Sequence, residues 1–222
     1  GLIGTTYFFA CDAVTFTGPI DLIQVCGTTT ISSGGGPGDN ITFGAFATID
    51  DSNAKTNLVL NAGASGNINL QADVGSACSI GSFTACNAAA AQVDVQNIIA
   101  CGCITFCGGN VDLNGTTYTA GGDVCFSSCG VDLDLAGGTV TITSGAGVGN
   151  GIAFNACAAI DDSGIGNTHL ILDAQGGDVN LASNVGSAVA INNFTINNAN
   201  QVDLKGILAD GNLCVCAVNT EL

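Results

Sequence analysis

The chain has 222 residues, of which 47% are apolar, and its 18 acidic residues face only two basic ones, for a formal charge of −16. Such a charge repels phosphate backbones, which excludes nucleic acid as a partner, while the apolar fraction is too high for a disordered chain. No apolar run reaches the roughly 18 residues that a membrane-spanning helix needs, and no signal peptide is recognisable, so membrane insertion is not expected.

The composition favours strands over helices. Glycine, asparagine, aspartate, threonine, valine and isoleucine dominate, with 33 glycines, whereas strong helix formers are scarce and methionine is absent. Turn-forming residues combined with β-branched ones are typical of short strands joined by tight turns. We therefore predict an all-β fold.

The predicted strands are short segments in which apolar residues flank a polar one. In chain order the clearest are 68–70, 93–95, 111–113, 131–135, 179–181 and 202–204. Because side chains alternate across a strand, the apolar residues are expected to face a core and the polar ones solvent. In the first four segments, the predicted inward residues are Ile68, Leu70, Val93, Val95, Val111, Leu113, Val131, Leu133 and Leu135.

The chain repeats itself after about 111 residues. Thr6-Tyr7 recurs at 117–118, Ile20-Asp21-Leu22 as Val131-Asp132-Leu133, Ile49-Asp50-Asp51-Ser52 at 160–163, and Val74-Gly75-Ser76-Ala77 at 185–188. Two repeats, 1–111 and 112–222, use the whole chain. Fixed-period similarity of this kind predicts one continuous repeat domain over 1–222.

The strand spacing suggests five coils in each repeat. Five steps of about 22 residues span one repeat, along Ile41, Ile68, Val93, Val111, Val131 and Ile152. That step suits one turn of a parallel β-solenoid, so about ten coils would form a rod of about 50 Å. The alternative is two tandem immunoglobulin-like β-sandwiches, but the chain has no linker at the repeat boundary and no tryptophan for their core.

Three stretches resemble the β-strand repeats of very large bacterial surface proteins, of which filamentous-haemagglutinin-like adhesins are the best-known members. The stretches are Asn40-Ile41-Thr42-Phe43, 56–63 and 66–70. The resemblance extends over most of the chain and implies a right-handed parallel β-helix, secretion, and a role as stalk, adhesin or fibre. The twelve cysteines depart from that family, whose members usually lack them.

The cysteines leave three interpretations open. Cys101-Gly102-Cys103 and Cys214-Val215-Cys216 are CxC pairs, and such closely spaced thiolates occur in metal and iron–sulfur sites. Most cysteines are not repeated, however: Cys78 corresponds to Val189 in the second repeat. Disulfides between stacked coils in an oxidising compartment, and small apolar residues of the core, are the other interpretations.

Two acidic pairs, Asp50-Asp51 and Asp161-Asp162, do recur in both repeats. Loop carboxylates are ligands that calcium prefers, so Asp50, Asp51, Asp161 and Asp162 are the candidate metal residues, for a weak site that occurs twice. The alternative is that they are solvated turn residues. No catalytic or cofactor-binding residue is predicted, because His169 stands alone and the chain has no arginine to stabilise a developing negative charge.

These features predict a structural protein and not an enzyme: an extracellular or cell-surface fibre, stalk or adhesin segment. A solenoid without caps presents bare strand edges at both ends, so the expected partners are copies of itself or further repeats, joined end to end. The alternative is a carbohydrate-binding or carbohydrate-cleaving β-helix protein that acts on surface glycans.

Overall fold

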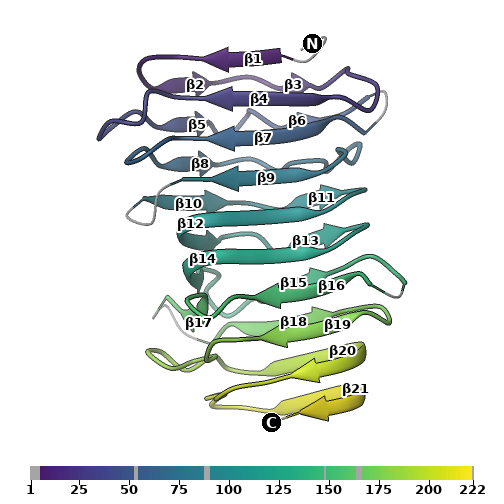
Figure 1. Cartoon of the computed structure of the whole chain (residues 1–222). Helices are drawn as coiled ribbons and strands as arrows, with labels where there is room; N and C mark the ends of the chain where they lie inside the picture. Colours follow the sequence, from purple (N-terminus) through teal and green to yellow (C-terminus); the bar gives the residue numbers. More distant parts are fainter. Residues whose placement is uncertain (1–5, 53–54, 88–90, 148, 164–166, 222) are drawn as a thin grey trace.

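The computed structural model describes residues 6–52, 55–87, 91–147, 149–163 and 167–221. The chain winds as a right-handed coil into a rod, with its two termini at opposite ends (Figure 1). The described residues form strands β1 to β21 and no helix, and all the strand pairs are parallel. The predicted parallel β-solenoid is therefore confirmed, and the sandwich alternative, which needs antiparallel sheets, is wrong.

Each turn of the coil adds one segment to each of three ladders that run along the rod. The first ladder contains β1 (Thr6–Phe9), β4 (Thr28–Ser32), β7 (Asn57–Asn61), β9 (Phe83–Cys86), the first halves of β12 (Ile104–Leu113) and β14 (Val124–Leu133), β16 (Gly151–Phe154), β19 (Asp178–Leu181), and the ends of β20 (Phe194–Asp203) and β21 (Leu213–Glu221). The second contains β2 (Val14–Phe16), β5 (Ile41–Phe43), β8 (Ile68–Leu70), β10 (Gln92–Val95), the second halves of β12 and β14, β17 (Ala159–Asp162), and bridges at Val185 and Ile207. The third contains β3 (Ile20–Asp21), β6 (Ile49–Asp50), a bridge at Val74, β11 (Ile98–Ala100), β13 (Thr117–Ala120), β15 (Thr139–Thr143), β18 (His169–Asp173), and the starts of β20 and β21.

One continuous core fills the rod. Inward side chains of all three ladders belong to a single cluster of buried apolar residues. Burying a large aliphatic or aromatic side chain contributes about 1.5–3 kcal/mol, so the stacked columns supply the main driving force for folding. Of the nine predicted inward residues, eight are fully buried. The exception is Leu135, which lies beyond the end of β14 and is only half-buried against the core.

The number of coils in a repeat differs from the prediction. The expected stack of Ile41, Ile68, Val93, Val111 and Val131 is observed. The last step fails, because Val131 pairs with Ile160, whereas Ile152 pairs with Val124 in the first ladder. One repeat therefore spans about four and two-thirds turns, because coil lengths vary and spacing alone does not reveal which face a strand occupies.

The aromatic columns show the same shift of one ladder. Phe16, Phe43 and Leu70 stack in the second ladder of the first repeat. Their equivalents Phe126, Phe154 and Leu181 stack in the first ladder. The geometry is conserved between the copies, with ring centroids 4.8 Å apart for Phe16–Phe43 and 4.4 Å for Phe126–Phe154. The second repeat is thus turned by one third of a revolution about the rod axis.

Candidate functional site

A column of carboxylates follows the outer face of the second ladder. Asp94, Asp112, Asp132 and Asp161 pair in register on consecutive coils, and Asn69 precedes them. Each carboxylate is the polar residue of a strand whose neighbours point into the core, so alternation places all four on one surface. Adjacent members are separated by about 4.8 Å, the spacing of neighbouring strands.

Burial and the neighbouring charges raise the pKa of three of these carboxyl groups, those of Asp94, Asp112 and Asp132. Partial burial, followed by a shared hydrogen bond with Asp94 and the charges of Asp94 and Asp134, raises the pKa of Asp112 to about 6. Burial is also the largest cause that raises the pKa of Asp94 and of Asp132. The Nε2 of Gln92 donates a hydrogen bond to the Asp112 carboxylate, which partly opposes the shift. The column holds like charges together on one line of the rod.

The predicted calcium residues Asp50 and Asp161 hold the loop of the next coil. Asp50 Oδ1 accepts hydrogen bonds from the N–H groups of Ala77 and Cys78, at 2.8 Å and 3.2 Å. Asp161 Oδ1 accepts from the equivalent Ala188 and Val189, at 2.7 Å and 3.2 Å. These charge-assisted bonds fix the loops that begin at Val74 and Val185.

Their neighbours Asp51 and Asp162 are buried, with 4% and 2% of their surface exposed. A carboxylate oxygen of Asp51 accepts from the N–H of Thr56, and Asp162 Oδ2 accepts from the N–H of Thr168 at 2.9 Å. The prediction of solvated turn residues is wrong for this pair, because both side chains point into the rod. The pairs lie on different ladders, with Asp50 on the third and Asp161 on the second.

Within the described residues, no group of three or more histidine, cysteine, aspartate or glutamate side chains is placed to hold a metal ion. The calcium site therefore stays a prediction. Sequence reasoning missed the carboxylate column, although the signal was present. The segments 93–95, 111–113 and 131–135 are predicted to stack, and each carries an aspartate as its second residue.

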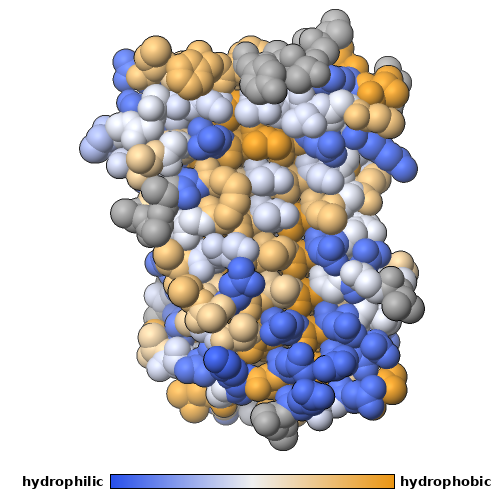
Figure 2. Space-filling view, in the orientation of Figure 1, coloured by the Kyte–Doolittle hydropathy of each residue, from blue (hydrophilic) through white to orange (hydrophobic). Residues whose placement is uncertain are grey.

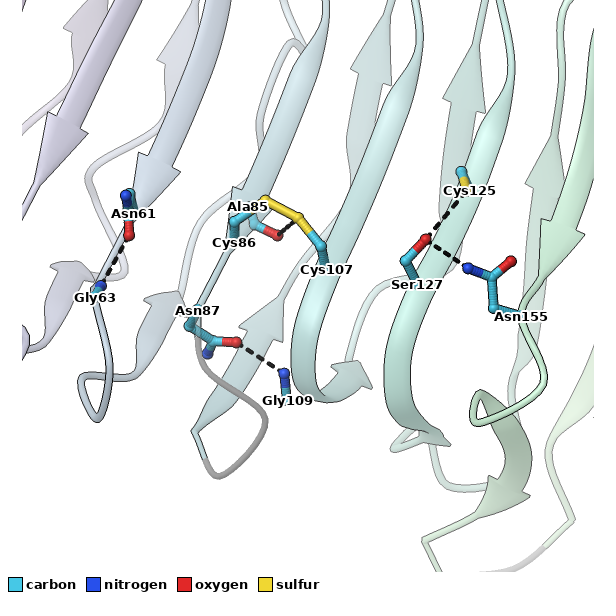
Figure 3. Close-up of a disulfide and its surroundings, with 10 residues drawn as sticks. All are labelled: Asn61, Gly63, Ala85, Cys86, Asn87, Cys107, Gly109, Cys125, Ser127 and Asn155. Carbon is cyan, nitrogen blue, oxygen red and sulfur yellow. Dashed lines mark hydrogen bonds between the residues drawn. A yellow bond between two sulfur atoms is a disulfide. The ribbon is translucent and has the colours of Figure 1, made fainter.

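The cysteines lie outside the core. Cys86 and Cys107 pair in register on β9 and β12 and form a disulfide across two coils, with a Cα–Cα distance of 4.7 Å. Figure 3 shows this bond on an outer column that continues to Ser127 on the next coil. All other cysteines that the structure describes are exposed or half-buried, so the core interpretation is wrong for them.

The remaining surface carries shallow hollows. The hollow beside β16 and β19 has a volume of about 260 Å³ and is lined by Asp123 and Asp178, among others. Both carboxylates are already engaged: Asp123 accepts from Gly151 N–H at 2.8 Å, and Asp178 from Gln201 N–H at 3.1 Å. These bonds link successive coils, which is a structural use of the two acids. His169 contacts Asn193 on the next coil in the same manner.

Hydrophilic side chains gather toward the C-terminal end of the face drawn in Figure 2. No helix among the described residues is long and apolar enough to cross a membrane. A search against protein-family models, curated proteins and solved structures finds no match for this chain.

Proposed function

We propose that the chain is a structural segment of a fibre, stalk or adhesin outside the cell or on its surface. The observation that carries the proposal is the continuity of the three ladders from β1 to β21. Each coil is held to the next by backbone hydrogen bonds on three faces, so a stack of coils transmits load along the axis. A repeated unit whose described hollows are shallow suits a shaft better than an enzyme.

The outer surface supports the same role. Carboxylates and amides such as Asp50, Asp161 and Asn97 bond to the coil beside them, and the acidic columns keep the rod soluble. The Cys86–Cys107 disulfide joins two coils, and such bonds persist in oxidising compartments outside the cytosol. The resemblance to filamentous-haemagglutinin-like adhesins points to the same setting.

The test is electron microscopy of the purified 222-residue chain together with a glycan-turnover assay. We expect rods that are at least about 50 Å long, from coils stacked at about 4.8 Å, and no turnover. Turnover of a glycan that disappears in a folded Asp132→Asn or Asp178→Asn variant would overturn the proposal in favour of the carbohydrate-active alternative.

A further inference from the structure

Among the described residues, the strands at both ends of the rod pair on one side only and carry apolar side chains. At the C-terminal end the column residue Leu213 is 55% exposed, and Val215 is only partly covered. At the other end the inward residues Val14 and Phe16 are only partly covered. Unpaired edges of this kind are templates for pairing with a further strand.

The coil geometry determines where a further strand fits. The end of β21 lies in the first ladder, where Glu221 pairs with Asp203. A strand that continues the coil after β21 would therefore lie in the second ladder, beside Ile207. If the first strand of a further unit instead paired with the end of β21 in the first ladder, the second and third ladders would each lack one strand at the junction. Each would then have an extra gap of about 4.8 Å, the width of one strand.

The molecule already contains the junction that such a fit would create. β13, the equivalent of β1, pairs with β11, and the start of β14, the equivalent of β2, pairs with the start of β12. The equivalent of β11 is 207–209, because Val74 pairs with Ile98 as Val185 pairs with Ile207. The equivalent of the start of β12 is the start of β21, because Phe83 and Phe194 occupy matching places beneath them.

We propose that a second copy of this chain docks on the C-terminal end with a rotation of one third of a turn. Its β1 lies on 207–209, its β2 on the start of β21, and its β3 on the end of β21. This proposal rests on the proposed end-to-end function and specifies its partner and geometry. In the resulting register, Val14, Thr15 and Phe16 of the second copy pair with Leu213, Cys214 and Val215.

Each of these pairs has a counterpart inside the rod. Ile104 pairs with Val124, Thr105 with Cys125, and Phe106 with Phe126. Phe106 and Phe126 stack with centroids 5.0 Å apart. At the junction Phe16 would cover Val215 in the same way, so the apolar column would continue from one copy into the next.

The test is a disulfide cross-link between copies. Thr15→Cys places a thiol on the exposed face of β2, and oxidised glutathione serves as the oxidant. We expect a ladder of covalent multimers on non-reducing gels, with mass spectrometry identifying a peptide in which residue 15 of one copy is bonded to Cys214 of the next. The yield should exceed that of the unmodified chain by on the order of tenfold, because docking raises the effective concentration of the two thiols.

Two matched variants control for chance collisions. Thr42→Cys makes the same change in β5, at the residue that pairs with Thr15. Because β5 lies between β2 and β8, this variant should give no covalent multimers. Thr15→Cys combined with Cys214→Ser should lose the ladder of multimers. Circular dichroism checks that every variant retains its strands.

Docking without rotation would place β1 on the end of β21 and β2 above 207–209, so that Thr15 would lie in a different ladder from Cys214. Polymers in light scattering that form no cross-link between residues 15 and 214 would overturn the rotated geometry but leave the fibre proposal intact. A chain that remains monomeric by light scattering at every concentration would overturn both.

Discussion

Aspartate side chains occupy two different environments in this rod. Asp51 and Asp162 are buried and accept N–H hydrogen bonds, so their charge is compensated. Asp94, Asp112 and Asp132 stand in a column of like charges in which the charged form is disfavoured. The two groups should therefore respond in opposite directions when the charge is removed.

Asp112→Asn should stabilise the chain at pH 7. The pKa of Asp112 is raised to about 6 in the folded chain, above the value of about 3.9 for an unfolded chain. Its contribution to stability is thus present in full below about pH 3.9 and is lost as the pH rises through about 6. Because the group is half exposed, we expect a gain below about 1 kcal/mol.

Urea unfolding between pH 4 and pH 7 measures this effect. The stability difference between Asp112→Asn and the unmodified chain should grow as the pH rises. A variant that is less stable than the unmodified chain at pH 7 would show that the Gln92 hydrogen bond outweighs the repulsion.

Asp162→Ala should destabilise the chain by about 1–3 kcal/mol, because the buried N–H of Thr168 would lose its acceptor. Asp162→Asn is the matched control, since its side-chain oxygen can still accept that bond, and it should cost less. Thermal unfolding of the two variants compares them. Equal losses would mean that the charge of Asp162, and not its role as acceptor for the Thr168 N–H, stabilises the chain.

At the scale of strands and loops, the sequence is informative about alternation and less so about position around the axis. The pattern of Val93-Asp94-Val95 predicts correctly which side chains are buried. It cannot show that Ile152 and Ile160 lie on different faces, because both fit an inward place and only the path of the intervening chain separates them. The pairing of Cys86 with Cys107 depends on the same register and was equally beyond prediction.

The loops after Val74 and Val185 depend on glycine. Gly75 and Gly186 both have φ of +73°, and a Cβ added at Gly75 would lie 2.1 Å from the carbonyl oxygen of Ile99. Gly75→Ala should therefore destabilise by more than the roughly 1–2 kcal/mol that a left-handed residue costs alone. The control is Gly137→Ala, with φ of +66° and nothing within 4 Å of the added Cβ. Equal denaturation midpoints for the two variants would contradict the steric argument.

At the scale of the whole molecule, the one-third rotation of the repeats determines how the surface recurs. Asp50 and the loop that it binds lie on the third ladder, whereas Asp161 and the equivalent loop lie on the second. A longer array with the same period would present each such loop on the three faces in turn. Two repeats were evident from the sequence, but the rotation follows from strand pairing, which the periodicity does not encode.

The proposed junction also brings like charges together. With β3 of one copy on the end of β21 of another, Asp21 would pair with Glu221, next to Asp50 on one side and Asp203 on the other. Inside the rod the equivalent pair is Asp112 and Asp132, where the same repulsion is tolerated because the apolar columns pack beneath it. Assembly should therefore be opposed by charge and driven by apolar burial.

Salt should promote assembly of this chain. Raising the ionic strength shortens the screening length from about 8 Å at 0.15 M to about 3 Å at 1 M, which weakens the repulsion between Asp21 and Glu221. Glu221→Gln should lower the concentration needed for assembly at low salt, whereas Asp94→Asn, which removes the same charge away from the junction, should change it less. Light scattering across a salt series measures the effect. If salt dissolves the polymers instead, ionic pairs hold the junction and the apolar contact of Phe16 with Val215 does not.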